Sequence, residues 1–371
     1  MKKILYPVSL IMICLILSGW GSKGHRKISQ NMAPCLPAQM SFLKPAWTNV
    51  VASNASAADY RKDEDPDESP RHFIDIDNYP EFVQSGYIEQ KYDSVVARHG
   101  LAFVIDQGIL PWATLTTYDS LKSCFRRGDW NKSALFAADL GHYVGDGHMP
   151  LHITRNYNGQ FSGQNGVHSR YETTMVGKFE SLIVYPVDSA RIIQNVREYV
   201  FASLYDDYKY VDSVLIADTY ATTTGGTTGS TEYYQALWAK SGDFTILMMR
   251  NASDALASLI YTAWVEAGSP RMYPNAIDEA IDPGQPRIIS VSPNPVRQSA
   301  VIRFEVPEND MMVALNIYDS NGKLRDSIVN EKMAEGYHKI DWTSENLNPG
   351  IYFCVLKSGS QTTTRKFVLV R

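Results

Sequence analysis

The sequence has 371 residues, of which 44% are hydrophobic and 20% are charged, and its formal net charge is −5. This composition excludes a chain that is disordered throughout, and the acidic balance argues against a broad basic groove for duplex nucleic acid. The length predicts two domains. Any phosphate site must then be local, and a bound metal is one source of its positive charge.

The first 19 residues predict a secretory signal peptide. Two lysines near the start precede an apolar run over 4–17, and the small residues Ser18 and Gly19 follow it. The run is shorter than the roughly 20 residues that a membrane-spanning helix needs. Cleavage after Gly19 would make Trp20 the first residue of the mature chain, although Leu17 fits the usual small-residue rule poorly. A retained membrane anchor is the alternative interpretation.

Residues 20–270 predict a mainly helical domain. Apolar residues recur at helical spacing in 130–141 and 244–267, and β-branched alternation is scarce. The threonine and glycine run at 222–230 predicts a flexible loop. The following stretch, 271–286, is rich in Pro, Asp and Gly and predicts a linker.

Residues 287–371 predict a small all-β sandwich. Turn signals such as Asn321-Gly322 separate short runs of alternating polarity. The predicted strands are 288–291, 300–306, 313–318, 338–342, 351–356 and 366–370.

Four cysteines are present, and Cys14 would leave with the signal peptide. Cys35, Cys124 and Cys354 remain, so at most one internal disulfide can form. None of them has the spacing of a zinc-binding cysteine pair. Whether Cys35 and Cys124 pair stays open.

The histidines carry the strongest signal for chemistry. His142 and Asp146 lie four residues apart, as do His168 and Glu172, which on a helix places each pair on one face. His152 follows a proline that ends the preceding helix and lets the chain turn back. One such pair is more often a surface salt bridge, but two pairs with a histidine between them predict a metal site. Imidazole and carboxylate ligands favour zinc.

At this point the sequence resembles a known superfamily. Segment 139–152, DLGHYVGDGHMPLH, resembles the signature of the superfamily that joins zinc-dependent single-strand-specific nucleases with bacterial zinc-dependent phospholipases C. The resemblance extends from Trp20 to about Gly268. It implies a mainly α catalytic domain of the phospholipase C or single-strand nuclease type, with three zinc ions that activate water for hydrolysis of a phosphoester.

The resemblance also implies the ligands. In the superfamily the mature N-terminus is a tryptophan whose amino and carbonyl groups bind zinc, and Trp20 with His25 matches the nuclease form. Asp59 has the family's spacing better than the acidic residues that follow it. The implied ligand sets are Asp59, His72, His142 and Asp146 for one zinc, His152, His168 and Glu172 for another, and Trp20 and His25 for the third, with Asp146 as a bridge.

The same resemblance implies catalytic roles for Asp59 and Asp146, with Asp59 orienting or deprotonating the attacking water. Arg61 or Lys62 could neutralise charge on the phosphoryl oxygens, and an exposed cation without a role is the alternative for both. Phe73 would stack on a base, unless it belongs to the core.

The base-binding prediction also assigns Asp75, which would read the edge of the base that Phe73 stacks on. These two residues and the Trp20 spacing favour a nuclease or 3′-nucleotidase acting on single-stranded nucleic acid or nucleotides. Glu172, where typical nucleases have Asp, is closer to the phospholipases, so phospholipase C is the alternative. A non-catalytic surface-binding module is a third reading, and the intact ligand set argues against it. We expect a monomer.

The C-terminal domain has a resemblance of its own. Segments 292–295, 348–352 and 366–371 resemble, in order, motifs of the sorting domain of type IX secretion. This implies contact with the secretion machinery and export through the periplasm and outer membrane, to the medium or the cell surface. A generic accessory sandwich that binds carbohydrate or protein is the alternative.

Overall fold

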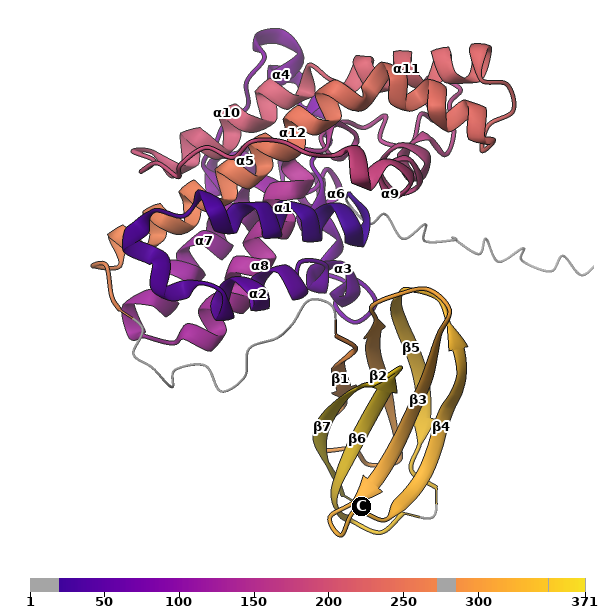
Figure 1. The fold of residues 1–371 in the computed structure, drawn as a ribbon. Helices are drawn as coiled ribbons and strands as arrows, with labels where there is room; N and C mark the ends of the chain where they lie inside the picture. The colour runs from indigo at the N-terminus through magenta and orange to yellow at the C-terminus, as the bar shows by residue number, and fades with distance from the viewer. Residues whose placement is uncertain (1–19, 272–284, 346, 371) are drawn as a thin grey trace, which may run out of the picture. The chain divides into compact units, whose positions relative to one another are not determined.

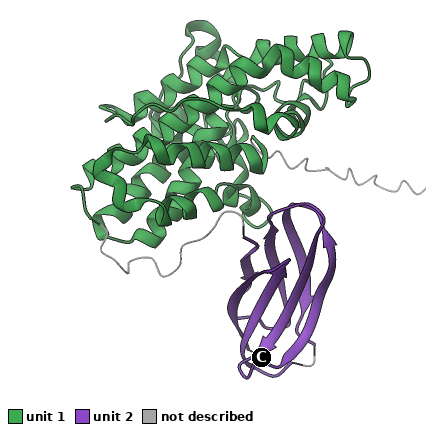
Figure 2. Cartoon of the chain, viewed as in Figure 1, with its two compact units in different colours: residues 1–278 green, residues 279–371 purple. Residues whose placement is uncertain are grey.

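The computed structural model describes residues 20–271, 285–345 and 347–370. The predicted signal peptide and most of the predicted linker lie outside the described residues. The chain divides into two compact units, residues 1–278 and 279–371 (Figure 2). The first is helical and the second consists of β-strands (Figure 1), as the sequence predicts.

The helical unit is built of short helices at its N-terminal end and long helices that form its core. The α-helices are α1 (Gly21–Cys35), α2 (Ala46–Ser53), α3 (Ala57–Arg61), α4 (Pro80–Ser85), α5 (Tyr92–His99), α6 (Leu101–Asp106), α7 (Leu110–Arg127), α8 (Trp130–Gly147), α9 (Val176–Phe179), α10 (Val196–Tyr208), α11 (Val211–Thr224) and α12 (Thr231–Glu266). Among the irregular turns, η2 (Ser69–His72), η4 (Pro150–His152) and the π-helical η5 (Ser169–Met175) matter for the site.

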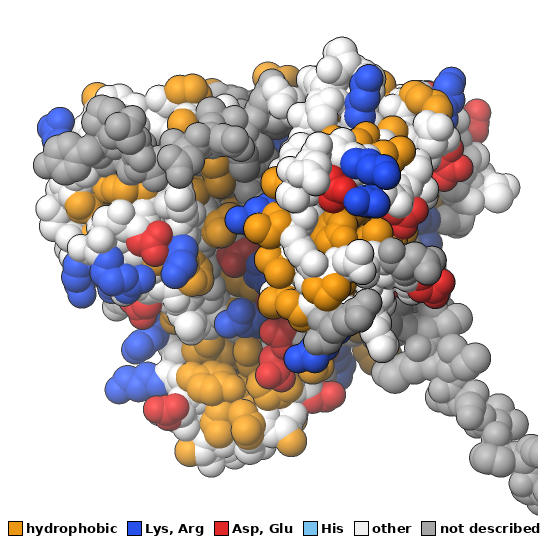
Figure 3. All heavy atoms as spheres, turned by 90° about the horizontal axis from the view of Figure 1, so that it is seen from below, with side chains coloured by type: hydrophobic (Ala, Val, Ile, Leu, Met, Phe, Trp, Pro, Cys, Tyr) orange, Lys and Arg blue, Asp and Glu red, His pale blue; other side chains and the backbone are white. Residues whose placement is uncertain are grey.

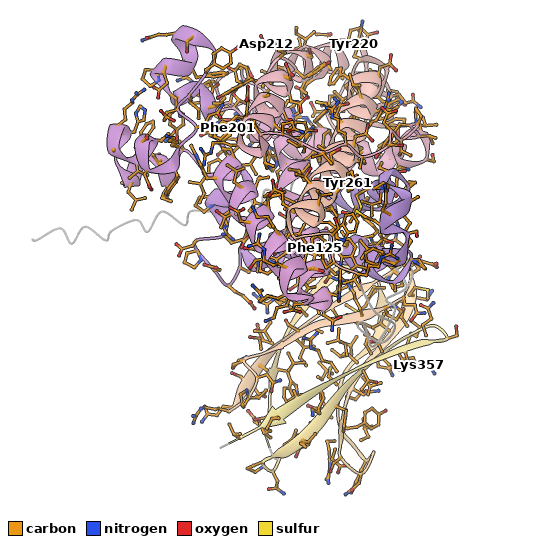
Figure 4. All side chains as sticks on the ribbon, turned by 90° about the vertical axis from the view of Figure 1, so that its left-hand side faces the viewer. Phe125, Phe201, Asp212, Tyr220, Tyr261 and Lys357 are labelled. Atoms are coloured by element: carbon orange, nitrogen blue, oxygen red, sulfur yellow. The ribbon has the colours of Figure 1, made fainter. Side chains whose placement is uncertain are left out.

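Helix α8 is the most buried of the long helices, because small residues on several sides let its neighbours approach closely. A Cβ atom at Gly141 would lie 2.8 Å from a methyl carbon of Leu256 on α12. The helix begins at the N-cap Asp129, whose side chain accepts a hydrogen bond from the amide of Lys132. Buried aromatic side chains such as Phe125 of α7 and Phe201 of α10 fill the space between helices (Figure 4).

The threonine run differs from the prediction. Instead of a loop over 222–230, α11 continues to Thr224. The hydroxyl groups of Thr222 and Thr224 donate to the carbonyls of Asp218 and Tyr220, four residues earlier, at 2.8 and 2.7 Å. These bonds satisfy the threonine hydroxyls on the helix backbone at the end of α11.

The second unit is a sandwich of two antiparallel sheets with strand orders β1-β2-β5 and β4-β3-β6-β7. Its strands are β1 (Arg287–Ser292), β2 (Ser299–Val306), β3 (Met311–Asp319), β4 (Leu324–Met333), β5 (Gly336–Thr343), β6 (Gly350–Ser358) and β7 (Gln361–Leu369). Six of them cover the predicted strands. The seventh, β4, was not predicted; it is an edge strand with one buried side chain, Val329, and so lacks clear alternation.

Two further observations concern the whole chain. Cys35, Cys124 and Cys354 are buried and free, so none of the possible disulfides forms among the described residues. No helix in the described part of the chain is both long and apolar enough to span a bilayer. On the face drawn in Figure 3, lysine and arginine side chains of the described residues lie among acidic and apolar ones, without an unbroken basic surface.

Candidate metal centre

Four segments that are distant in sequence bring their histidines and carboxylates together inside the helical unit. They are α1, the stretch from α3 to η2, the C-terminal half of α8, and the stretch from η4 to η5. All eight predicted side-chain ligands fall into three groups whose ligand atoms lie within 4.8 Å of one another: His25, Asp59 and His142; His72, His142 and Asp146; and His152, His168 and Glu172. Each of these side chains is buried.

Asp59, His72, His142 and Asp146 form what we call the first cluster. Their ligand atoms are separated by distances typical of a zinc site. The Nδ1 atom of His72 lies 3.0 Å from both Oδ2 of Asp146 and Nε2 of His142. His142 Nε2 lies 3.4 Å from Asp146 Oδ2 and 3.4 Å from Asp59 Oδ1. Asp59 Oδ1 lies 3.7 Å from His72 Nδ1. Zinc bonds of about 2.0–2.2 Å place tetrahedral ligand atoms about 3.3–3.6 Å apart. The four side chains therefore fit one zinc ion.

The second cluster lies on η4 and η5. His152 Nε2 and His168 Nε2 lie 3.2 and 3.0 Å from the two different oxygens of Glu172. Glu172 lies in the π-helical η5 and His168 is the residue directly before it, instead of both lying in one α-helix. Such turns are often found at functional sites. Two imidazole nitrogens and one carboxylate around a buried point again suit zinc.

Asp146 connects the first cluster to its neighbours. Its Oδ2 faces His72 and His142, whereas its Oδ1 lies 3.4 Å from Nε2 of His25. Oδ1 also lies 3.6 Å from Nδ1 of His152, but that nitrogen pairs with the carbonyl of His72 and is not a candidate ligand atom. The His25 ring stacks on that of His142, with 3.9 Å between ring centroids. The two oxygens of one carboxylate thus face different sets of nitrogens, which is the arrangement that a bridging ligand requires.

Trp20 lies beside these clusters. Its side chain is fully buried, and its indole Nε1 donates to the carbonyl of Gly145 at 2.8 Å. Its ring centroid lies 6.1 Å from that of Tyr171. Gly145 is adjacent to Asp146 of the first cluster, and Tyr171 is adjacent to Glu172 of the second. The start of α1 therefore lies close to both clusters.

Several buried polar atoms of the site make no hydrogen bond within the described chain, although some of them lie at ion-pair distance from one another. Within the described chain no hydrogen bond is made by either ring nitrogen of His25, by Nε2 of His168 or by Oδ1 of Asp146. An unpaired buried polar atom is costly. A cation among these atoms would remove that cost, so the donor set fits the metal that the sequence predicts.

The charges of the site favour a cation as well. Burial alone raises the pKa of Asp146, but His142 and His152 outweigh burial and hold that pKa well below its usual range. Burial lowers the pKa of His142, but Asp59 and Asp146 overcome this effect and raise it to about 9. His25 is the exception, because burial and then His142 lower its pKa. Without a metal, Asp59 and Asp146 therefore favour the protonated form of His142, and a bound metal ion would replace that proton.

The two predicted cationic residues have carboxylate partners. Lys62 donates to Oδ1 of Asp59 at 2.7 Å, so its ammonium group lies at the edge of the first cluster. Arg61 instead contacts Glu68 at 3.1 Å and Asp139 at 3.0 Å. The Arg61 guanidinium is therefore engaged in a structural network.

The predicted base-binding residues follow η2 directly. Phe73 is half-buried, and its carbonyl accepts from the amide of Leu110. Asp75 has a buried Oδ1 without a hydrogen-bond partner in the described chain. Burial, followed by the charges of Asp77 and Asp106, raises its pKa to about 7.

Sequence reasoning missed Glu68 and Tyr143. Glu68 is only 2% exposed, contacts His72, and accepts a hydrogen bond from the hydroxyl of Tyr143. Tyr143 stands next to His142 in the superfamily signature. Glu68 lies four residues before His72, a spacing that could have singled it out among the acidic residues of this stretch.

The sequence of the second unit matches a known family. Residues 290–370 match the model of the secretion system C-terminal sorting domain. The predicted sorting domain is therefore confirmed, and the protein is exported across the outer membrane, either secreted or displayed at the cell surface.

Comparisons of the whole chain with curated proteins and with solved structures are less informative. None of the curated proteins matches this sequence. Among solved structures the chain is similar to an alpha toxin from Clostridium absonum, with 11% identity and a TM-score of 0.41 over 95% of this chain and 96% of that one. It is also similar to the alpha-toxin of an avian Clostridium perfringens strain, with 9% identity and a TM-score of 0.39 over 94% and 98%. Similarity at this level assigns neither activity nor substrate.

Proposed function

We propose that the protein is a secreted phosphodiesterase that binds three zinc ions. The observation that carries this proposal is the first cluster, in which the ligand atoms of Asp59, His72, His142 and Asp146 are separated by the distances of a tetrahedral zinc site. His152, His168 and Glu172 would hold a second ion. Trp20 and His25, with Asp146 shared, would hold the third.

When bound, zinc lowers the pKa of water to near neutrality and stabilises negative charge on phosphoryl oxygens. The chain's own residues hold and orient the reacting groups. Asp146 presents its two oxygens to different clusters, so it sets their separation. Asp59 lies within 2.7 Å of Lys62, which brings a positive charge to the rim of the site. We assign Lys62 the role of neutralising the substrate's phosphoryl group.

Single-stranded nucleic acid or a 3′-nucleotide is the first candidate substrate. It is supported by Asp75, because a buried carboxylate oxygen without a protein partner can bind the edge of a base. Phe73, two residues earlier, would supply the stacking surface, which is worth about 1–3 kcal/mol per base. This candidate therefore depends on Phe73 and Asp75, together with the spacing from Trp20 to His25.

A phospholipid is the second candidate, and a different observation favours it. Four large hydrophobic side chains between residues 80 and 106 are solvent-exposed: Val83 at 71%, Tyr87 at 63%, Leu101 at 56% and Ile105 at 37%. They lie in the α4–α6 region that follows Phe73. Exposed apolar side chains in one region suit contact with a lipid surface. Glu172, the acidic ligand more typical of the phospholipases, agrees with this candidate.

The substrate is decided by assaying mature protein that begins at Trp20, loaded with zinc, on single-stranded DNA, RNA, 3′-mononucleotides and phosphatidylcholine vesicles. We expect hydrolysis of one class, lost on chelation and restored by zinc. Asp75→Asn should impair nucleic-acid hydrolysis and leave phosphatidylcholine hydrolysis unchanged. If the zinc-loaded protein cleaves none of these phosphoesters, the proposed function is wrong.

The metal set is decided by elemental analysis, which should find close to three zinc ions per chain. Asp146→Asn should abolish hydrolysis and release more zinc than His25→Ala, because Asp146 contacts more than one cluster. Asp119→Asn is the matched control, since Asp119 is an exposed aspartate that pairs with Lys122. Near-normal turnover in Asp146→Asn would contradict the shared ligand.

A further inference from the structure

Three of the clustered histidines are oriented in the same way. The Nδ1 atoms of His142, His152 and His168 each pair with a main-chain carbonyl, those of Ala55, His72 and Tyr157, at 2.8, 2.6 and 3.0 Å. A histidine that donates Nδ1–H to a carbonyl keeps the lone pair of Nε2 for a metal. The backbone thus selects the ligand nitrogen of these three residues.

His72 is oriented the other way round. Its Nδ1 lies inside the first cluster, 3.0 Å from Asp146 Oδ2, and its Nε2 points away from the cluster. No main-chain carbonyl accepts a hydrogen bond from the His72 ring in the described chain. Nε2 lies 3.3 Å from Oε1 of Glu68 instead, at ion-pair distance but outside the geometry of a hydrogen bond. A carboxylate therefore stands where the other three histidines have a carbonyl.

Glu68 is held in place by its own partners. Its Oε2 lies 3.1 Å from Nε of Arg61, and its Oε1 accepts from the hydroxyl of Tyr143. Arg61 also contacts Asp139 on α8 at 3.0 Å, so it links Glu68 to the helix that carries His142. A carboxylate that is 2% exposed is costly to bury without such partners. The network therefore fixes the position of Glu68 relative to α8.

We infer that Glu68 is the positioning residue of His72, and that Arg61 and Tyr143 act through Glu68. The carboxylate accepts the proton of Nε2 and so keeps the lone pair of Nδ1 directed at the metal. This inference rests on the proposed function only in taking His72 as a zinc ligand. It gives Arg61 a task different from the predicted contact with the phosphoryl group.

The test measures metal binding and ring orientation directly. Competition with a chromogenic chelator should show zinc bound about 10–100-fold more weakly by Glu68→Ala than by the full-length processed protein. Glu68→Gln, which keeps an acceptor oxygen without the charge, should recover part of the loss. In the zinc-loaded wild type, the ¹⁵N chemical shifts of the His72 ring should show a protonated Nε2. In zinc-loaded Glu68→Ala this pattern should be lost. Glu81→Gln is the matched control, because Glu81 pairs with His99 at 2.8 Å outside the centre.

Arg61 separates positioning from substrate binding. We expect Arg61→Ala to weaken zinc binding and change the His72 signals; a raised KM with unchanged zinc affinity would overturn its assigned role. If Glu68→Ala does not fold, Glu68→Gln and Tyr143→Phe supply the measurement. If both variants keep the zinc affinity and the His72 ¹⁵N shifts of the wild type, the inference is overturned, whatever their activity. A wild-type protein that binds zinc but cleaves no phosphoester would instead refute the proposed function alone.

Discussion

At the scale of single residues, Asp75 gives a prediction that does not depend on metal. Burial raises its pKa to about 7, whereas an aspartate in an unfolded chain titrates near 3.9. The folded protein therefore binds more protons than the unfolded chain between about pH 4 and pH 7. The stabilisation associated with the protonated carboxyl is present at the acidic end of this window and is lost as the pH rises through it.

Asp75→Asn removes this titration. The melting temperature of Asp75→Asn minus that of the wild type, both measured at saturating zinc, should therefore increase as the pH is raised from 4.5 to 8. Asp212→Asn is the control, because Asp212 is exposed on α11 (Figure 4), and its difference from the wild type should stay constant. A difference for Asp75→Asn that does not vary with pH would contradict the buried carboxyl.

The ligands and their supports differ in how far the sequence could predict them. His142 with Asp146, and His168 with Glu172, are detectable because ligands on one helix recur at a fixed spacing. Glu68 lies four residues before His72, but its other partner, Tyr143, is 75 residues away, and that contact depends on how η2 packs against α8. A contact made by tertiary packing leaves no local pattern in one sequence.

At the scale of elements, the close approach of α1 to α8 depends on Gly145. A Cβ at this position would lie 2.8 Å from Nδ1 and 3.0 Å from Cε1 of His25. Gly145→Ala should therefore displace His25 and reduce the zinc content measured by elemental analysis, even though alanine is the better helix former. We expect a net loss of about 1–3 kcal/mol in the free energy of unfolding.

Gly177 on α9 provides the control for this substitution, because a Cβ there would meet no atom within 4 Å. Gly177→Ala should be neutral or stabilise by up to about 1 kcal/mol. If both alanine variants behave alike, close packing at Gly145 is not what fixes His25.

Helices and strands could be predicted from the sequence where packing against the core imposes one periodicity of hydrophobic residues along the chain. Strands β3 and β6 bury alternate side chains along most of their length, and α12 buries one side along its length. The edge strand β4 buries little, and α11 ends in threonines whose side chains bond to the helix backbone. In both cases the structure is decided by hydrogen bonds that the hydrophobic pattern does not record.

At the scale of the whole molecule, the sorting domain and the candidate metal centre belong to different units. Truncation after Pro270 removes the sorting domain at residues 290–370 and leaves every ligand of the candidate centre. The truncated protein, purified with its mature N-terminus, should keep its zinc and its phosphoester hydrolysis, while immunoblotting of cell fractions should find it retained inside the producing cell. Lost zinc together with normal release would reverse the roles of the two units.

The proposed ligand role of Trp20 predicts that activity depends on cleavage of the signal peptide. Only a free α-amino group at Trp20 can bind zinc together with its own carbonyl, because a preceding peptide bond removes the lone pair of the nitrogen. The structure places Trp20 against Gly145, next to the shared ligand Asp146. A protein with one extra methionine before Trp20 should therefore lose the zinc bound through His25 and most of its hydrolytic activity.

Removing that methionine with a protease that leaves Trp20 first should restore both, which elemental analysis and the phosphodiesterase assay would show. An extra residue at the C-terminus is the matched control and should change neither. N-terminal sequencing of the secreted protein supplies the independent check, since Leu17 is an unusual residue three positions before the predicted cut. Three bound zinc ions and full activity in a chain that begins at any other residue would exclude Trp20 as a ligand. The third ion would then have to be held by side chains alone, with His25, Asp59 and His142 as the available group.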